Sequence, residues 1–301
     1  MKDAVLVMAY GTPRGLDDVE AYYTDIRHGK SPSPEQLEDL TARYRAIGGR
    51  SPLLEITEKQ ARGVGDRAGV PTYVGQKHAA PFIPDAIEAM KRDGVERAIG
   101  LVLAPHFSSL SIGDYARRAA AGAEAAGWDG TVQMIESWHQ EPAFIDLLAG
   151  YCTDALGALP DETQTGTTFV FTAHSLPASI VGRGDPYPEQ LRETAQGVAD
   201  ELGLQRWRVG WQSAGRTEQE WLGPDVLDIL EELASSGSEA VVVCPCGFVA
   251  DHLEVLYDLD IEAARRAAEL GIAFGRTRSP NDDPAFLDML AGVVTRAMQA
   301  A

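Results

Sequence analysis

The stretch FVFTAHSLPASI, residues 169–180, joins an apolar run to a turn that contains proline, with a histidine at the junction. Its first part, FVFTAHSLP (169–177), resembles VLVMAYGTP (5–13). In both stretches an apolar run ends in alanine, a polar residue with a ring follows (His174 or Tyr10), and a turn with proline comes next. A short apolar run closed by turn residues is typical of a strand that is buried on both faces. The two stretches therefore predict two buried strands, with Tyr10 and His174 in equivalent positions at their ends.

Two further pairs of segments repeat in the same order along the chain. YVGQKHAAPFIPDAI (73–87) resembles VGWQSAGRTEQEWLGPDVLDIL (209–230), and AIGLVLAPHFSS (98–109) resembles AVVVCPCGFVAD (240–251). Chance similarity between apolar strands is the alternative, but the matches extend into the turns that follow the strands. Self-similarity of this kind predicts that one structural unit occurs twice.

The repeat predicts an α/β fold with two similar halves, residues 1–150 and 151–301, joined through the linker-like GALPDETQTG (157–166). Apolar runs alternate with helical patterns, as expected for four-stranded parallel sheets with helices on both faces. Ligands bind at the carboxyl ends of such strands, so we expect the turns there to line one cleft between the halves. We expect strands near residues 3–9, 71–76, 98–104, 131–136, 168–173, 207–212, 239–244 and 271–275.

Composition excludes several classes of protein. The chain has 301 residues, enough for two domains of about 150 residues each, and 26 basic against 45 acidic residues give a net charge of −19. This charge disfavours binding to nucleic acid or to anionic lipid, and no apolar run reaches the roughly 18 residues of a membrane span. Three cysteines in a chain of this length favour a reducing compartment. We expect a soluble, cytoplasmic protein.

The segment DHLEVLYDLDIEAARRAAELG (251–271) predicts an acidic helix from about residue 251 to 270, ended by Gly271. Asp251 and Glu254 have the spacing of a capping box, which gives Glu254 a purely structural alternative role. Glu254, Asp258 and Glu262 follow at intervals of four, so they would share one face of the helix. That face is either solvated, with Glu262 paired to Arg266, or a row of carboxylates for divalent cations or protons.

His174 and Glu254 would meet if the turns at the strand ends converge on one cleft. A neutral imidazole beside a carboxylate suits the binding of a transition metal or the transfer of a proton near pH 7. A histidine at a strand end also occurs for structural reasons alone, and the acidic stripe beside it favours the functional interpretation.

The first turns of the chain carry the opposite charge. Arginine binds carboxylates bidentately, so a basic cluster near Tyr10 indicates a planar ligand that bears carboxylates. Pairing of these residues with Asp25, Glu38 and Asp39 on helix surfaces is the alternative. The cluster consists of Arg27, His28, Lys30, Arg43, Tyr44, Arg45 and Arg50.

Taken together, these motifs resemble those of the ferrochelatase family, in the same order and over essentially the whole chain. The resemblance is strongest to the soluble bacterial branch, which inserts ferrous iron into coproporphyrin III, and it implies two Rossmann-like domains, the chelatase fold, around a porphyrin cleft. The matching motifs are AYGTP (9–13), YYTDIRHGK (22–30), RYRAIGGRSPL (43–53), APHFSSLS (104–111), VFTAHSLP (170–177), GWQSAGRT (210–217), WLGPDV (221–226) and GFVADHLEVLYDLDIE (247–262).

The resemblance also implies roles for single residues. His174 and Glu254 match the pair that binds metal and handles protons on one porphyrin face, and Asp258 and Glu262 match an outer row of metal-binding carboxylates. Tyr10 matches the residue that ligates iron from the other face in the product. Residues that hold porphyrin propionates are matched by Arg27, Arg43, Tyr44, Ser51 and Tyr115.

The resemblance implies coproporphyrin III and ferrous iron as substrates, with no resident cofactor. Some members carry a [2Fe–2S] cluster on four cysteines, but this chain has only Cys152, Cys244 and Cys246, so we expect no cluster, and we expect Cys244 and Cys246 to be buried. A hydrated divalent cation on the acidic helix, a monomeric state and a downstream enzyme of haem synthesis as partner are further expectations. The alternatives are a chelatase for protoporphyrin IX or for cobalt, and a tetrapyrrole carrier without catalytic activity.

Overall fold

The computed structural model describes residues 2–215 and 217–300, and its strands form two four-stranded parallel sheets. The strand orders are β2-β1-β3-β4 and β6-β5-β7-β8, so the two sheets share one topology. Each predicted strand is present, with ends that differ from the prediction by at most two residues, which confirms the predicted fold class. The strands are β1 (Asp3–Ala9), β2 (Thr72–Gln76), β3 (Arg97–Val102), β4 (Thr131–Ile135), β5 (Thr168–His174), β6 (Trp207–Gln212), β7 (Ala240–Cys244) and β8 (Ala273–Arg276).

The repeat predicted from the sequence is confirmed by the positions of β1 and β5. Each is an inner strand, paired with the second and third strands of its own half. Ala9 lies opposite Gln76 in the first sheet, and His174 lies opposite Gln212 in the second. Tyr10 and His174 therefore leave the carboxyl ends of equivalent strands.

Burial on both faces explains why these strands are continuously apolar. Leu6 and Met8 of β1 pack into one hydrophobic cluster, whereas Val5 and Val7 pack into another on the opposite face of the sheet. In β5 the same alternation places Phe171 in the cluster that contains Val5 and Val7. One hydrophobic cluster therefore extends through both halves and connects them.

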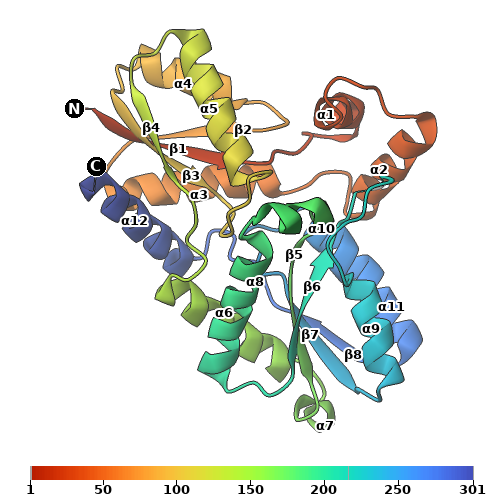
Figure 1. The fold of residues 1–301 in the computed structure, drawn as a ribbon. Helices are drawn as coiled ribbons and strands as arrows, with labels where there is room; N and C mark the ends of the chain where they lie inside the picture. The colour runs from red at the N-terminus through yellow and green to blue at the C-terminus, as the bar shows by residue number, and fades with distance from the viewer. Residues whose placement is uncertain (1, 216, 301) are drawn as a thin grey trace.

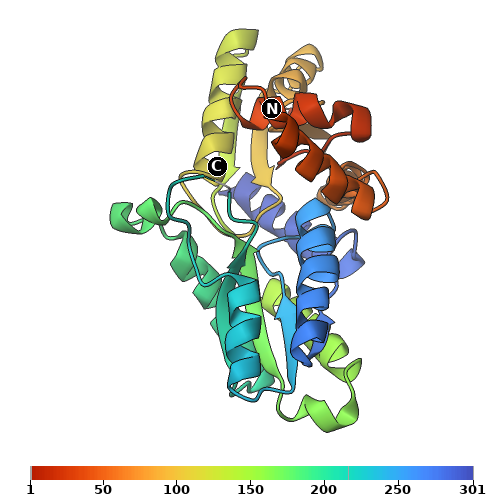
Figure 2. The same ribbon diagram turned by 90° about the vertical axis from the view of Figure 1, so that its right-hand side faces the viewer.

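Helices cover both faces of each sheet, and Figures 1 and 2 show the two halves one above the other. The helices are α1 (Val19–Ile26), α2 (Pro34–Ala46), α3 (Leu53–Ala68), α4 (Ile83–Arg92), α5 (Ile112–Ala126), α6 (Pro142–Gly157), α7 (Asp161–Gln164), α8 (Tyr187–Leu202), α9 (Val226–Ser235), α10 (Leu253–Tyr257), α11 (Ala264–Leu270) and α12 (Pro284–Gln299), with the 3₁₀ turns η1 (Leu16–Asp18) and η2 (Ala178–Arg183) and the π-helical segment η3 (Asp258–Ala263).

The chain between the sheets is mostly helical, whereas a linker was predicted there. The predicted boundary between residues 150 and 151 falls inside α6, which packs against α8 and β7 of the second half. The last helix, α12, returns to the first half and lies beside α3, as Figure 1 shows. A Cβ atom on Gly63 of α3 would lie 2.5 Å from Cδ1 of Leu287 of α12, so a larger residue there would require the Leu287 side chain to move.

Polar contacts fix the two halves relative to each other close to the strand ends. The buried side-chain amide of Gln60, on α3, donates to the carbonyls of Val249 (2.9 Å) and Asn281 (2.8 Å) in the second half. On another side of the molecule, the Asp185 carboxylate accepts hydrogen bonds from the backbone and hydroxyl of Ser109. These contacts bring the carboxyl ends of both sheets to a common region.

Candidate active site

His174, the last residue of β5, is oriented through its own backbone surroundings. Its Nδ1 donates to the carbonyl of Ser175, and the Tyr187 hydroxyl donates to the His174 carbonyl at 2.9 Å. Because a carbonyl oxygen only accepts, Nδ1 carries a proton and Nε2 is left to face the site. Nε2 lies 3.5 Å from Oε1 of Glu254.

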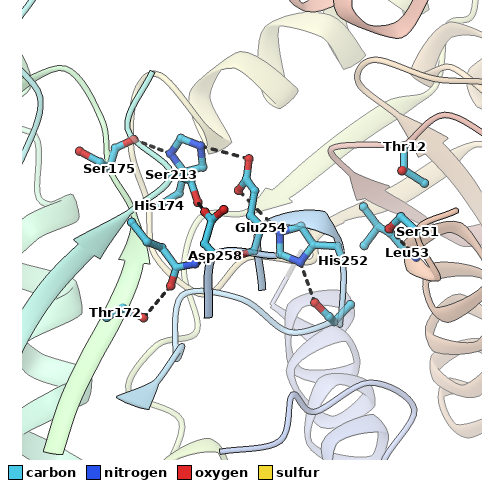
Figure 3. A network of polar contacts seen from close by, with 12 residues as sticks. Thr12, Ser51, Leu53, Thr172, His174, Ser175, Ser213, His252, Glu254 and Asp258 are labelled. Atoms are coloured by element: carbon cyan, nitrogen blue, oxygen red, sulfur yellow. Dashed lines mark hydrogen bonds and ion pairs between the residues drawn. The ribbon is translucent and has the colours of Figure 1, made fainter. Parts of the chain in front are cut away.

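Glu254 lies between two imidazoles, as Figure 3 shows. Its second oxygen, Oε2, lies 3.6 Å from Nε2 of His252. Its backbone is held by Gln212 of β6, whose side-chain amide donates to the Glu254 carbonyl (3.1 Å) and accepts from the Thr172 hydroxyl (2.9 Å). Two adjacent strands thus position the start of α10, and the predicted pair of His174 and Glu254 is in contact.

The electrostatics of the pair favour its charged form. Burial alone would lower the pKa of His174, but the Glu254 carboxylate and the Ser175 carbonyl raise it to about 9. Burial alone would raise the pKa of Glu254, but His174 and His252 hold it below its usual range. These pKa directions favour an imidazolium beside a carboxylate in the substrate-free chain, whereas the sequence led us to expect a neutral imidazole.

Asp258 is the next carboxylate along the chain, and it is buried. Its Oδ2 accepts from the Ser213 hydroxyl, and its Oδ1 lies 3.6 Å from Nη1 of Arg43 in the first half. Burial and the nearby Glu254 carboxylate raise the pKa of Asp258 to about 7, although Ser213 and Arg43 act in the opposite direction. Asp258 can therefore gain or lose a proton near neutral pH.

The acidic helix differs from the regular α-helix that was predicted. It consists of α10, the π-helical segment η3 that begins at Asp258, and α11. A π-helical turn changes the angle between successive side chains, so the i, i+4, i+8 stripe is interrupted. Asp258 is turned into the protein instead of sharing a solvated face.

Two side-chain pairings that were structural alternatives for this segment do not occur among the described residues. Asp251 forms no capping box; its carboxylate accepts from Ser279 and Asn281, at 2.8 Å each. Arg266 does not pair with Glu262 but with Glu231 (2.7 Å) and Glu269 (3.0 Å). Glu262 is close enough to contribute to the raised pKa of Asp258.

Tyr10 is a residue of the first half whose pKa the Glu254 carboxylate affects. It directly follows β1, is 42% exposed, and has the His78 ring 4.7 Å away and the Lys77 ammonium 5.9 Å from its ring centroid. Burial by surrounding groups, followed by the Glu254 carboxylate, raises the pKa of Tyr10 above its usual value. Tyr10 is therefore reached by water and is close enough to Glu254 of the other half for that carboxylate to affect its pKa.

Lys77 and His78, at the end of β2, belong to this wall of the site and were not predicted. Lys77 lies 2.7 Å from Asp114 and 5.5 Å from the centroid of the Tyr115 ring, and His78 Nδ1 lies 2.6 Å from Asp25. His252 and Ser213 were likewise missed. The sequence could have indicated these residues, because each lies in a turn after a parallel strand, where the predicted site residues also lie.

The predicted carboxylate-binding residues are placed around the first half. Tyr44 is buried with its hydroxyl 3.2 Å from the Thr12 hydroxyl, and Tyr115 is buried below Lys77. The Ser51 hydroxyl accepts from the Leu53 amide at the start of α3. Arg27 follows α1 and lies over the Tyr23 ring.

Part of the basic cluster is paired with acidic residues on helix surfaces, as the alternative interpretation expected. Arg45 pairs with Glu38 (2.7 Å) and Arg43 lies 3.3 Å from Asp39, whereas Asp25 contacts His78 instead. Arg43 also reaches the acidic segment, through Asp258.

The candidate metal residues do not form a ready-made cage. Within residues 2–215 and 217–300, no three His, Cys, Asp or Glu side chains are grouped as a bound metal ion requires. His174 and Glu254 are in contact, and Asp258 follows further along the acidic segment. Two surface cavities, of about 710 and 560 Å³, lie elsewhere, on α9 and between α3 and α12. Cys152, Cys244 and Cys246 are buried free thiols.

A sequence model of the family described as Ferrochelatase matches residues 2–298. The chain belongs to the ferrochelatase family. The coproporphyrin III ferrochelatase of Geobacillus kaustophilus is 48% identical over 300 residues, covering 97% of this chain and 95% of that protein. The ferrochelatase of Herpetosiphon aurantiacus is 46% identical, covering 98% of each chain.

Solved structures agree on the fold of this ferrochelatase-family chain. SirB from Bacillus subtilis with Fe³⁺ superposes with a TM-score of 0.62 at 12% identity, covering 99% of this chain and 98% of that chain. SirB from the spizizenii subspecies of Bacillus subtilis, a sirohydrochlorin chelatase in complex with cobalt, gives 0.57 at 11% identity, covering 99% and 96%. Such low identity supports a shared chelatase fold and nothing about substrate. None of the helices described is both long and apolar enough to cross a bilayer.

Proposed function

We propose that this chain inserts ferrous iron into coproporphyrin III and so forms Fe-coproporphyrin III, or coproheme, in haem biosynthesis, as a lyase. The observation that carries the proposal is the contact between His174 and Glu254 at the end of β5. Membership of the family and the similarity to proteins named coproporphyrin III ferrochelatase support the same reaction.

Insertion of iron requires two pyrrole protons to leave the porphyrin, so the site needs a proton acceptor and an exit. The favoured charged form of the pair has His174 protonated at Nε2, so the imidazole can act as a base only after that proton has left. Glu254 lies between His174 and His252 and offers a route by which the proton can leave. The contacts of 3.5 and 3.6 Å are long for proton transfer and would shorten around bound substrate.

The same residues suit the passage of ferrous iron, which is a substrate here. Carboxylates and an imidazole bind borderline cations, and a spread of such ligands holds the ion weakly enough to release it to the porphyrin. We expect His174, Glu254, Asp258 and Glu262 to contact the metal in turn, with a hydrated divalent cation on the acidic segment.

Tyr10 would face the opposite side of the porphyrin and bind iron in the product. Its raised pKa keeps the hydroxyl neutral in the substrate-free chain. A metal ion in contact with the oxygen favours the deprotonated form, so the phenolate ligand would develop only once iron is in place.

Coproporphyrin III carries more carboxylates than protoporphyrin IX, and the first half offers donors for them. Arginine is the best partner for a carboxylate, and tyrosine and serine hydroxyls add directed hydrogen bonds. We assign this role to Arg27, Arg43, Tyr44, Ser51 and Tyr115.

We propose a monomeric, cytoplasmic enzyme without an iron–sulfur cluster, which passes its product to a later enzyme of haem synthesis. The net charge of −19 favours neither nucleic acid nor an anionic membrane as partner.

The proposal is tested by anaerobic mixing of the purified chain with Fe²⁺ and either coproporphyrin III or protoporphyrin IX, while porphyrin fluorescence is followed. Rapid loss of coproporphyrin fluorescence alone is the expected result. Equal use of both porphyrins would instead indicate a ferrochelatase without this preference. Tight binding without metallation of either would indicate a carrier.

A further inference from the structure

Arg43, one of the residues of the first half that we assign to porphyrin carboxylates, contacts the acidic segment of the second half. It lies on α2, and its Nη1 is 3.6 Å from Oδ1 of Asp258. Its guanidinium carbon lies 4.9 Å from the centroid of the Tyr257 ring, on the same acidic segment. A residue assigned to a porphyrin carboxylate is therefore held, in the substrate-free chain, by a residue assigned to the metal path.

The hold of Asp258 on Arg43 is loose. A separation of 3.6 Å exceeds the 2.7–2.9 Å of a charge-assisted hydrogen bond, whereas the Nε of Arg43 lies 3.3 Å from Oδ2 of Asp39 on the same helix. The Arg43 side chain is 24% exposed, so an incoming group can reach it. A carboxylate that binds the guanidinium through two parallel hydrogen bonds would be a better partner than Asp258.

Asp258, by contrast, is held on its other side. Its side chain is 9% exposed, and its Oδ2 keeps the hydrogen bond from Ser213. If Arg43 leaves, Asp258 stays in place but loses its nearest cation. Exchange of the partner of Arg43 therefore alters the charge at Asp258 without moving it.

We propose that a carboxylate of the porphyrin and the carboxylate of Asp258 compete for Arg43, so that porphyrin binding uncovers Asp258. The inference rests on the proposed function, since the competitor is a substrate carboxylate. Once uncovered, Asp258 attracts a divalent cation more strongly. Because coupling between two ligands is reciprocal, a cation at Asp258 also releases Arg43 for the porphyrin, and each substrate favours the binding of the other.

The test is the affinity of coproporphyrin III for Asp258→Asn, measured by quenching of porphyrin fluorescence without iron. Removing the competing carboxylate frees Arg43, so the variant should bind coproporphyrin about two- to fivefold more tightly than the wild type, the range of a partly exposed ion pair. Glu262→Gln is the matched control, because it removes one negative charge from the same segment without freeing Arg43. In an Arg43→Met background, Asp258→Asn should no longer strengthen binding.

Asparagine has the shape of aspartate and can keep the contact with Ser213, and circular dichroism checks the fold; Asp258→Ser repeats the test if asparagine perturbs it. Equal affinities of Asp258→Asn and Glu262→Gln, in a chain whose wild type binds and metallates coproporphyrin, would overturn this inference alone. Weaker binding by Asp258→Asn would also overturn it, because Asp258 would then orient Arg43 rather than compete for it. Failure of coproporphyrin to bind the wild type would overturn the proposed function together with the inference.

Discussion

Nε2 of His174 lies 3.5 Å from Oε1 of Glu254, although one residue ends a strand and the other begins a helix after a different strand of the same sheet. The parallel order β6-β5-β7-β8 makes this contact possible, since it brings all carboxyl ends to one edge. The pair holds a proton at His174 that must leave before the imidazole can act as a base.

Replacing Glu254 by glutamine should lower the pKa of His174 from about 9 towards its ordinary value of 6.5, because this carboxylate raises the pKa more than the Ser175 carbonyl does. Iron insertion should slow by about 100-fold or more, the usual effect of losing a general acid–base group. NMR titration of the His174 ring and steady-state metallation measure the two effects. Asp260→Asn removes a carboxylate of the same segment that is bonded to Arg276, and it should leave the pKa of His174 unchanged.

Tyr10→Phe should leave the stability of the chain within about 0.5 kcal/mol of the wild type, because the residue is 42% exposed. The visible spectrum of the iron product bound to the enzyme should change, because an oxygen ligand has been removed. Absorbance spectra of wild type and variant loaded with the same iron porphyrin make the comparison. Identical spectra would exclude Tyr10 as a ligand.

Gln212→Leu should reduce kcat for metallation by about tenfold with little change in KM for the porphyrin, because the lost hydrogen bond fixes Glu254 and not the ring. Gln76→Leu is a matched control from the repeat. Gln76 is likewise the buried last residue of its strand, β2, but it donates to Ala80. Loss of kcat in both variants to the same degree would mean that general destabilisation, not the position of Glu254, explains the result.

The stability of the substrate-free chain should depend on Asp258 between about pH 4 and pH 7. Its pKa is raised from 3.8 to about 7 on folding, so the folded chain binds more protons than the unfolded chain in this window. The free energy of unfolding contributed by this group therefore falls as pH rises through the window. Asp258→Asn should remove that fall, gaining about 1 kcal/mol or more relative to the wild type between pH 4 and pH 8. Urea unfolding at several pH values tests this, and parallel pH profiles for the two proteins would contradict it.

The strands and the repeat were predictable because they depend on local patterns. A buried parallel strand must be apolar along its length, and the turn after it must carry proline or small residues, so both signals lie within about ten residues of sequence. The meeting of His174 and Glu254 followed from the rule that such turns converge at one edge.

The details of the acidic segment were not predictable, because distant residues decide them. Asp251 is bonded by Ser279 and Asn281, which removes it from the helix start. Burial of Asp258 against Ser213 and Arg43 accompanies a π-helical turn that the local sequence does not distinguish from an α-helix. The contact of Arg43 with Asp258 joins residues of different halves, and no local sequence pattern predicts it.

The most direct test of the account is the anaerobic, single-turnover insertion of Fe²⁺ into coproporphyrin III already bound to the chain, compared between the wild type and His174→Ala. The account predicts that the variant binds the porphyrin within about threefold of the wild-type affinity but inserts iron at least about 100-fold more slowly, because the proton acceptor is gone. Insertion by His174→Ala at the wild-type rate would contradict the central role of the His174–Glu254 pair.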